Sequence, residues 1–353
     1  MSTFYKLPVK EVKQETKNAV SIVFDIPKEL QKEFSFIPGQ YITIKKELSG
    51  KEVRRAYSIC SSKKSNTIRI GVKAVNKGLF SVFATSNLIK GDILEVSPPE
   101  GRFILNPNKN KNYLAFVAGS GITPVLSMLK SVLESDNNNK FVLVYGNKTP
   151  DEVMFKNDID HLKVNYPDQL FVYYTYSKVN NENALFGRID ISTVNYIIKN
   201  KHKGTDFDEF FLCGPESMID TVKTDLLNKG ITDQNIHFEL FSTKVEETDT
   251  SADVSDGKLD GETVITIVLD DEEETFSMKK ETSILEAALT KGLDAPYSCQ
   301  GGICSTCLAQ VIEGKALMDN NSILSDEEVE EGLILTCQAH PITDKITIDY
   351  DAV

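Results

Sequence analysis

The sequence has no long apolar run: nowhere does it approach the roughly 18 apolar residues that a membrane-spanning helix needs. Its first ten residues, MSTFYKLPVK, lack the apolar stretch of a secretion signal. Six cysteines in 353 residues, without such a signal, do not form the dense pattern of a disulfide-stabilised secreted domain. We therefore expect a cytoplasmic protein without a membrane-spanning segment, long enough for two or three domains.

Histidine is also scarce, with four residues in the whole chain. His161, His202 and His237 stand singly, and His340 follows a cysteine in CQAHP. A Rieske centre needs paired histidine ligands, and a diiron site in a helical bundle uses Glu-x-x-His pairs. The sequence supplies neither, which excludes an oxygenase centre of either type.

Basic residues are outnumbered by acidic ones, 39 against 52, so the net charge is −13. This balance argues against binding to nucleic acid or to an anionic membrane. The charge is uneven: residues 243–353 hold 25 acids and 7 bases, whereas residues 1–242 hold 27 acids and 32 bases. An acidic C-terminal third is either a solvated surface or a docking face for a basic partner protein.

The sequence divides into three segments that differ in their pattern of strand-like and helical stretches. Residues 1–107 carry short strand-like runs at 19–26, 40–45, 67–75 and 93–96, separated by glycine turns and without long helices between them. This pattern predicts an antiparallel β-barrel. In residues 111–241, apolar strand-like runs alternate with helical stretches at 124–134, 151–165 and 217–229. That alternation predicts a doubly wound α/β domain with a parallel sheet.

Residues 242–261 are polar and acidic, which predicts a flexible linker. Residues 262–353 then show a strand pair at 262–269 and 274–279, a helix near 283–291, a cysteine-rich loop and a final strand at 345–350. We expect a compact α+β module. The predicted fold class is therefore multidomain.

The cysteine loop gives the most specific signal. Cys299, Cys304, Cys307 and Cys337 follow the spacing C-x4-C-x2-C with a distant fourth cysteine, as in plant-type [2Fe–2S] proteins. Thiolates suit iron and sulfide, and Gly301 and Gly302 let the backbone direct N–H groups at the sulfurs. Four buried cysteines without a metal, or a zinc site, are the alternatives, but zinc loops usually repeat C-x2-C twice.

Two short motifs in the first segment suit a flavin. In RAYS, a guanidinium can meet a pyrophosphate, a phenol ring the isoalloxazine, and a hydroxyl a ring nitrogen; these are Arg55, Tyr57 and Ser58. Gly78 and Ser81 stand where a helix N-terminus could receive phosphate. Taken alone, each motif also fits an ordinary edge strand or helix start.

In the second segment, the strand-like run 113–118 leads directly into Gly119-Ser120-Gly121-Ile122-Thr123-Pro124 and a helix. A glycine-rich turn between a parallel strand and a helix is where dinucleotides bind. A second tight turn, Cys213-Gly214-Pro215, follows the strand-like run 209–212. The first turn lacks the full GxGxxG pattern, and the second is also explained by an ordinary turn without a role in ligand binding.

In this order, RAYS, GxxS, GSGITP and CGP resemble the ferredoxin–NADP reductase superfamily over residues 5–242, and APYSCQGGICSTC resembles the cluster loop of plant-type ferredoxins, a β-grasp fold. The resemblance implies flavin binding by Arg55, Tyr57 and Ser58, with Gly78 and Ser81 at the flavin diphosphate. It implies that Gly119, Gly121, Thr123, Cys213, Gly214 and Pro215 lie along the nicotinamide nucleotide, and that the four cysteines of the loop ligate the cluster. It also places Glu239 near the contact between flavin and nicotinamide, where the alternative is a surface carboxylate. The residues implied in the reaction itself are Tyr57, Ser58, Cys213 and Glu239.

The domain order resembles the reductase components of multicomponent oxygenases. It implies that electrons pass from NADPH through FAD and the [2Fe–2S] cluster to an oxygenase component. Ser177, Lys178 and Arg188 can supply the hydroxyl and positive charge that a 2′-phosphate needs, which favours NADPH over NADH. FMN remains the alternative to FAD. The expected acceptor is a diiron oxygenase; a Rieske dioxygenase, a fatty-acid desaturase or hydroxylase, and a redox-sensing protein without turnover are the alternatives.

Overall fold

The structure is a computed structural model that describes residues 3–108, 110–135, 138–241 and 261–353. The described residues pack as two compact units, one of residues 4–241 and one that includes residues 261–353. Most of the predicted linker over 242–261 lies outside the described residues. No helix in the described part of the chain is long and apolar enough to cross a membrane.

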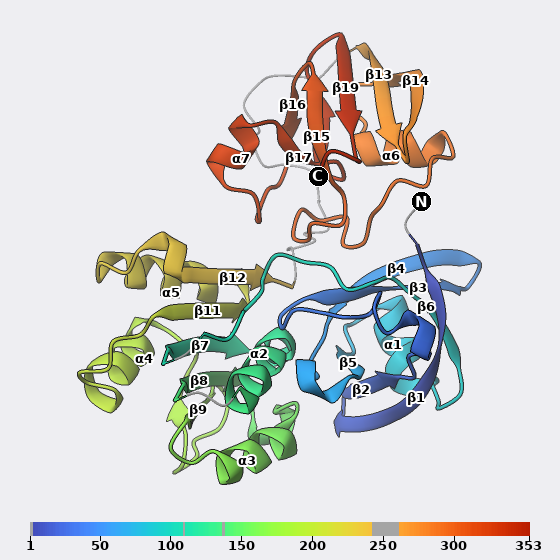
Figure 1. The fold of residues 1–353 in the computed structure, drawn as a ribbon. Coiled ribbons are helices and arrows are strands. Elements are labelled where there is room, and N and C mark those ends of the chain that lie inside the picture. The colour runs from blue at the N-terminus through green and yellow to red at the C-terminus, as the bar shows by residue number, and fades with distance from the viewer. Residues whose placement is uncertain (1–2, 109, 136–137, 242–260) are drawn as a thin grey trace. The chain divides into compact units, whose positions relative to one another are not determined.

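The N-terminal half of the first unit is an antiparallel sheet with the strand order β4-β3-β6-β1-β2-β5 (Figure 1). Its strands are β1 (Tyr5–Thr16), β2 (Ala19–Phe24), β3 (Tyr41–Leu48), β4 (Lys51–Ser58), β5 (Ile68–Lys73) and β6 (Ile93–Val96). An isolated bridge from Ile59 to Ile70 joins the end of β4 to β5, so the two outer strands of the sheet meet. Alternating apolar residues such as Ile22, Ile42 and Ile70 fill the interior, and α1 (Leu79–Ser86) packs Phe80 and Ala84 against it. The predicted antiparallel barrel is thereby confirmed.

The other half of this unit is a parallel sheet with the strand order β10-β9-β8-β7-β11-β12. Its strands are β7 (Asn112–Ala118), β8 (Lys140–Asn147), β9 (Leu170–Tyr176), β10 (Leu185–Phe186), β11 (Glu209–Gly214) and β12 (Ile236–Leu240). The helices are α2 (Ile122–Glu134), α3 (Lys156–Asn165), α4 (Ile191–Asn195) and α5 (Glu216–Asn228). Because β8 and β11 flank β7, the strand order reverses at β7, which is where doubly wound folds bind ligands.

One predicted helix begins later than its sequence pattern indicates. The pattern predicts a single helix over residues 151–165, but a short 3-10 turn (Pro150–Glu152) comes first and α3 starts at Lys156. Phe155 between them has a φ of 56° and is completely buried, with the Arg69 guanidinium 5.0 Å from its ring. Burial of this ring outweighs helix propensity, which is a weak local preference.

The C-terminal unit is a five-stranded sheet with the order β14-β13-β19-β15-β17 and a separate pair, β16–β18. The strands are β13 (Glu262–Leu269), β14 (Glu272–Lys279), β15 (Leu308–Glu313), β16 (Ala316–Met318), β17 (Leu333–Leu335), β18 (Ala339–Pro341) and β19 (Lys345–Asp349). The helices are α6 (Ile284–Thr290), which Ser283 caps, and α7 (Asp326–Glu330), which begins with a capping box from Ser325 and Glu328. This is the predicted α+β module.

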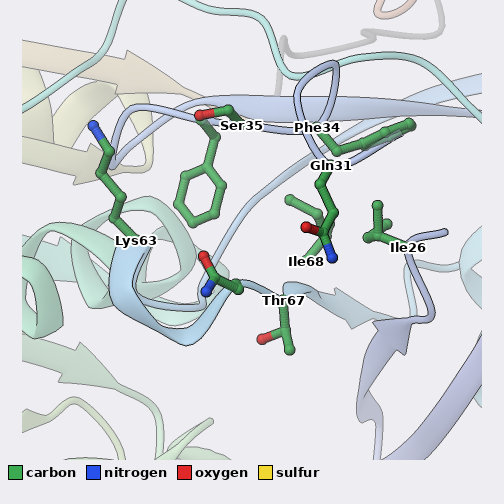
Figure 2. A pocket seen from close by; sticks show the side chains of 9 residues that line it. Ile26, Gln31, Phe34, Ser35, Lys63, Thr67 and Ile68 are labelled. Atoms are coloured by element: carbon green, nitrogen blue, oxygen red, sulfur yellow. The ribbon is translucent and has the colours of Figure 1, made fainter. Parts of the chain in front are cut away.

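A pocket of about 80 Å³ opens on the barrel beside Phe34 and Ile68, with Gln31, Lys63 and Thr67 among its lining residues (Figure 2). Pockets that hold drug-sized ligands typically measure about 300–1,000 Å³. This pocket is therefore too small for a dinucleotide, and none of the predicted site residues lines it.

A buried ion network joins the barrel to the nucleotide domain. Arg69 of β5 contacts Glu15 of β1 at 2.6 Å and Asp158 of α3 at 2.7 Å, and Lys130 of α2 contacts Asp158 at 2.8 Å. The four side chains are 5–16% exposed. Burial alone would raise the pKa of Asp158, but Lys130 and Arg69 outweigh it and hold that pKa below its usual range. Two acids and two bases balance, so the network fixes one domain against the other without net buried charge.

Replacing Asp158 by asparagine should lower the free energy of unfolding by about 3–5 kcal/mol at pH 7, because buried Lys130 loses its carboxylate partner and Arg69 loses one of its two. The folded-state pKa of Asp158 is lowered, so this contribution is present at neutral pH and is lost as the pH falls from about 4 toward the folded-state pKa. Urea unfolding at pH 7 measures it. Asp160→Asn, which removes an exposed pair with Lys156 on the same helix, should change stability by about 0.5 kcal/mol or less; equal losses in both variants would contradict the account.

Candidate active site and cluster site

The barrel presents the RAYS residues on β4, which pairs with β3 through Arg55–Ile44, Tyr57–Ile42 and Ser58–Tyr41. Arg55 is exposed, Tyr57 is half-buried and Ser58 is buried. The Tyr57 ring lies 5.5 Å from that of Phe80 in α1, and burial raises the pKa of its hydroxyl well above the usual value. β4 thus presents an exposed cation, a fixed aromatic ring and a hydroxyl along one strand.

The turn that precedes α1 is close to this strand, because Phe80 reaches Tyr57. Gly78 caps α1, and a side chain there would lie 2.4 Å from both the Ser81 hydroxyl and a Val75 methyl group. The Ser81 hydroxyl is buried and accepts a hydrogen bond from the Val75 N–H at 3.2 Å. The Ser81 hydroxyl therefore stabilises the turn. The group of Ser81 that could bind a phosphate is its backbone N–H, near the start of the helix.

The glycine turn after β7 and the CGP segment, whose Cys213 and Gly214 end β11, lie against each other. A side chain at Gly121 would lie 2.3 Å from the carbonyl oxygen of Cys213, so only glycine fits there. Gly119 has a φ of +56° and open space around it, and Gly214 packs against Ala118 and Met218. The two turns thus form one continuous edge of backbone at the carboxyl ends of β7 and β11.

Two other residues predicted near the nucleotide have structural contacts. Thr123 is buried and donates its hydroxyl hydrogen to the Ser120 carbonyl at 3.0 Å, which holds the turn in shape. Pro215 precedes α5 and accepts hydrogen bonds from Met218 and Ile219.

The predicted reaction residues converge at this edge. Ser58 donates a hydrogen bond to Glu239 at 3.4 Å, although the two stand 181 positions apart in the chain. Glu239 lies directly beside Cys213 in the register of β11 and β12. Burial raises the pKa of Glu239 to about 8, which the Ser58 hydrogen bond partly opposes. Burial and the Glu239 charge raise the pKa of Cys213, so its thiol stays neutral.

The cationic residues predicted for a 2′-phosphate lie elsewhere on the same edge. Ser177 and Lys178 follow β9, and their N–H groups donate to the carbonyls of Asn147, which ends β8, and of Lys148, which follows it. Arg188 follows β10, which pairs with the end of β9. β9 and β12 are four strands apart, or roughly 19 Å at about 4.8 Å per strand. A ligand that reaches both places must be extended, as a dinucleotide is.

Two residues at this edge of the sheet were not predicted from the sequence as part of the site. Tyr145 in β8 donates its hydroxyl hydrogen to the Gly119 carbonyl at 2.9 Å and so fixes the glycine turn. Lys148 is exposed beside Lys178 and adds a third cation to that end. Both lie in YGNK at the end of an apolar strand-like run, and their position at the carboxyl end of a parallel strand was the signal that could have identified them.

In the C-terminal unit, the structure brings together the four predicted cluster cysteines. Cys299 is half-buried and the other three are buried. Hydrogen bonding to Cys304 and Cys337 lowers the pKa of Cys299, and hydrogen bonding to Cys337 lowers that of Cys307. Among the described residues, no three His, Cys, Asp or Glu side chains surround a single metal ion. A binuclear cluster does not need such a group, because each of its irons takes two protein ligands.

The backbone around the cysteines is held by polar contacts. The Gly301 N–H donates to the Cys299 sulfur at 3.3 Å. Thr336 donates its N–H and its hydroxyl to the Cys307 carbonyl at 3.1 and 3.0 Å, and Tyr350 donates to the Thr336 hydroxyl at 2.9 Å. The donor set, four thiols and N–H groups aimed at sulfur, fits a [2Fe–2S] cluster.

Comparison with protein families gives three matches along the chain. Residues 6–104 match the oxidoreductase FAD-binding domain, residues 116–224 the oxidoreductase NAD-binding domain, and residues 267–341 the 2Fe-2S iron-sulfur cluster binding domain. The cofactors FAD, a nicotinamide nucleotide and a [2Fe–2S] cluster are thereby confirmed. They fall on the barrel, the parallel sheet and the cysteine module in that order.

Two relatives match this chain over almost its whole length. The chain is 38% identical to one of the subunits of 1,2-phenylacetyl-CoA epoxidase of Escherichia coli (strain K12), over 100% of this chain and 99% of that protein. It is 34% identical to the ferredoxin reductase component of 3-ketosteroid-9-alpha-monooxygenase of Rhodococcus rhodochrous, over 98% and 96%. Phthalate dioxygenase reductase has a similar fold, with a TM-score of 0.60 at 22% identity and 98% coverage of both chains.

Proposed function

The chain belongs to the family of oxygenase reductase components that combine FAD-binding, NAD-binding and [2Fe–2S] domains. On that basis we propose that it transfers electrons from NADPH to the oxygenase component of a phenylacetyl-CoA epoxidase, a diiron enzyme. The observation that carries the proposal is the contact of Ser58, from the flavin barrel, with Glu239, beside Cys213 in the nucleotide domain. This contact brings the proposed flavin site of the barrel next to the proposed nicotinamide site of the parallel-sheet domain, and hydride transfer requires the two sites to be adjacent. We assign the flavin domain to residues 1–107, the nucleotide domain to 111–241, the linker to 242–261 and the ferredoxin domain to 262–353.

When bound, NADPH supplies a hydride, FAD accepts two electrons and releases them singly, and the [2Fe–2S] cluster carries one electron at a time. Ser58 and Tyr57 orient the flavin ring through a hydroxyl and an aromatic face, and the exposed Arg55 guanidinium meets its pyrophosphate together with the turn at Gly78 and Ser81. Cys299, Cys304, Cys307 and Cys337 hold the cluster as thiolates.

On the nucleotide side, the backbone edge formed by Gly119, Gly121, Thr123 and the turn from Cys213 to Pro215 lets the pyrophosphate and nicotinamide approach closely. Glu239 holds or releases a proton beside this edge, because its pKa of about 8 lies near working pH. The neutral Cys213 thiol excludes water from the contact without adding charge. The acidic surface of residues 270–274 and 326–331 is proposed to face a basic region of the partner.

Removing the 2′-phosphate contacts should raise KM for NADPH and leave KM for NADH unchanged. A hydrogen bond to a charged group contributes about 1.5–3 kcal/mol, so Lys178→Ala or Arg188→Ala should each raise KM for NADPH about tenfold or more. Steady-state kinetics with both nucleotides measure this. Lys163→Ala, at an exposed position on α3, is the control; an equal rise for NADH would contradict the assignment.

The partner is tested by reconstitution. The purified protein is mixed with the oxygenase component of a phenylacetyl-CoA epoxidase, or with that of a 3-ketosteroid 9α-monooxygenase, and NADPH oxidation and product are measured together. We expect tight coupling of NADPH oxidation to product with the epoxidase only. Coupling with the ketosteroid enzyme instead would assign the chain to that kind of partner, and coupling with neither would contradict both.

A further inference from the structure

The loop that carries three of the cysteines is held from outside by its carbonyl groups. Three consecutive carbonyls each accept a hydrogen bond from a neighbouring segment. Gln300 accepts from the Gln338 side chain at 3.1 Å, Gly301 accepts from the Asn320 side chain at 2.8 Å, and Gly302 accepts from the Ser322 N–H at 3.1 Å. The loop is thus clamped by segments 320–322 and 338.

Holding a carbonyl also directs the N–H group of the next residue. In a trans peptide the C=O and N–H bonds point in opposite directions, and no cis peptide occurs in the described residues. With the Gln300 carbonyl held by Gln338, the Gly301 N–H points inward and donates to the Cys299 sulfur at 3.3 Å. With the Gly302 carbonyl held by Ser322, the Ile303 N–H is also turned toward the Cys299 sulfur.

Gln338 makes a second contact that ties the loop to the fourth cysteine. Its side-chain amide donates both to the Gln300 carbonyl and to the carbonyl of Cys337, each at 3.1 Å. One side chain therefore bridges the backbones of the two segments that supply the cysteines, so a change at Gln338 reaches both.

Close packing keeps this clamp in place. Gly302 has a φ of +73°, and a side chain there would lie 2.6 Å from the Asn320 carbonyl oxygen and 3.1 Å from Cγ of Gln338. Asn320 is itself fixed, since its side-chain oxygen accepts from the Ser322 hydroxyl at 3.3 Å. The three clamping residues thus surround the glycine that lets the loop bend.

We propose that Gln338 and Asn320 are positioning residues that set the reduction potential of the [2Fe–2S] cluster, by holding the loop carbonyls outward so that the loop N–H groups face the cysteine sulfurs. The proposal rests on the proposed ligation of the cluster by the four cysteines. Hydrogen bonds to sulfur stabilise the extra negative charge of the reduced cluster and are one of the determinants of its potential. Releasing a carbonyl lets its peptide rotate, so the cluster becomes harder to reduce.

The test compares Gln338→Met, which keeps the packing on Gly302 and removes the N–H donors, with Gln310→Met. Gln310 is the matched control because its side chain also donates to backbone carbonyls, those of Glu331 and Val311, away from the cysteine loop. The midpoint potential of the cluster is measured in the full-length protein by redox titration followed by EPR. Resonance Raman spectra in H₂O and D₂O report N–H···S bonds directly.

We expect Gln338→Met to lower the equilibrium constant for cluster reduction about tenfold, which is 59 mV for a one-electron couple, and to reduce the D₂O shift of the Fe–S bands. Asn320→Ala should act in the same direction, and Gln310→Met should match the unmodified protein. Unchanged potentials in both clamp variants would overturn the proposal. So would loss of the cluster from both while Gln310→Met retains it, because the residues would then only retain the cluster. If the unmodified protein itself shows no reduced-cluster signal, the cluster ligation and the proposed function fail instead.

Discussion

Replacing Cys307 by alanine should remove the [2Fe–2S] cluster and reduce electron delivery to the oxygenase component by about a hundredfold or more, since even residues outside the ligand shell cost 10–100-fold when mutated at metal sites. Cys307 is 1% exposed, so water has little access to the position that its sulfur would leave. Iron content, the EPR signal of the reduced protein and NADPH-dependent turnover with the oxygenase measure the effect.

The same variant should retain NADPH oxidation with ferricyanide, an acceptor that does not require the cluster, because the flavin and nucleotide sites lie in the other compact unit. Cys60→Ala is the matched control: Cys60 is also a buried cysteine, but it belongs to residues 4–241 and lies outside the ligand set. It should keep the cluster and the turnover. Normal electron delivery by Cys307→Ala would show that the cysteine spacing does not define the electron path.

The rate of flavin reduction by NADPH should rise about tenfold between pH 7 and pH 9, a change of about 1.4 kcal/mol in the barrier. Glu239, with a pKa of about 8, is mostly protonated at pH 7 and mostly ionised at pH 9. Positive charge develops on the nicotinamide ring as hydride is lost. If Glu239 lies beside that ring, as proposed, its carboxylate stabilises this charge. Two charges about 4 Å apart interact by about 4 kcal/mol at an effective dielectric constant of 20, which is ample for this change. Anaerobic stopped-flow absorbance measures the rate.

Glu239→Gln should make the rate independent of pH and hold it near the pH 7 value, because glutamine stays neutral. Ser58→Ala should move the inflection above pH 8, since the Ser58 hydrogen bond lowers the pKa of Glu239. Glu209→Gln is the control; Glu209 is a carboxylate at the start of β11, paired with His237 at 3.5 Å. An inflection near pH 8 that persists in Glu239→Gln would assign the titration to another group.

How much the sequence predicts depends on whether a feature is local. The cluster loop is predictable because three of its four cysteines lie within nine positions, and the glycine turn follows an apolar strand directly. Contacts between distant segments are not predictable, because the spacing of residues along the chain does not say which strands and helices lie next to each other. Ser58 contacts Glu239 across 181 positions, and Arg69 contacts Asp158 across 89. Glu239 enters the predicted site only through the family resemblance of HFELF.

Other features escape prediction because their residue types are ordinary. Glutamine and asparagine at 338 and 320 carry no chemical signature, and their significance comes from the carbonyls that they contact in the folded chain. The start of α3 is predicted too early, because the completely buried ring of Phe155 imposes a left-handed backbone that helix propensity does not anticipate. Tertiary contacts decide both outcomes.

The central claim, that electrons pass from NADPH through the flavin to the cluster, is tested most directly by anaerobic titration of the cluster-loaded protein with NADPH and, separately, with NADH. Visible absorbance follows the flavin and low-temperature EPR follows the cluster in the same samples. The account predicts flavin bleaching together with a rhombic reduced-cluster signal, at lower concentrations of NADPH than of NADH. Bleaching without the EPR signal would contradict the step from flavin to cluster, and no bleaching with either nucleotide would contradict the reductase function as a whole.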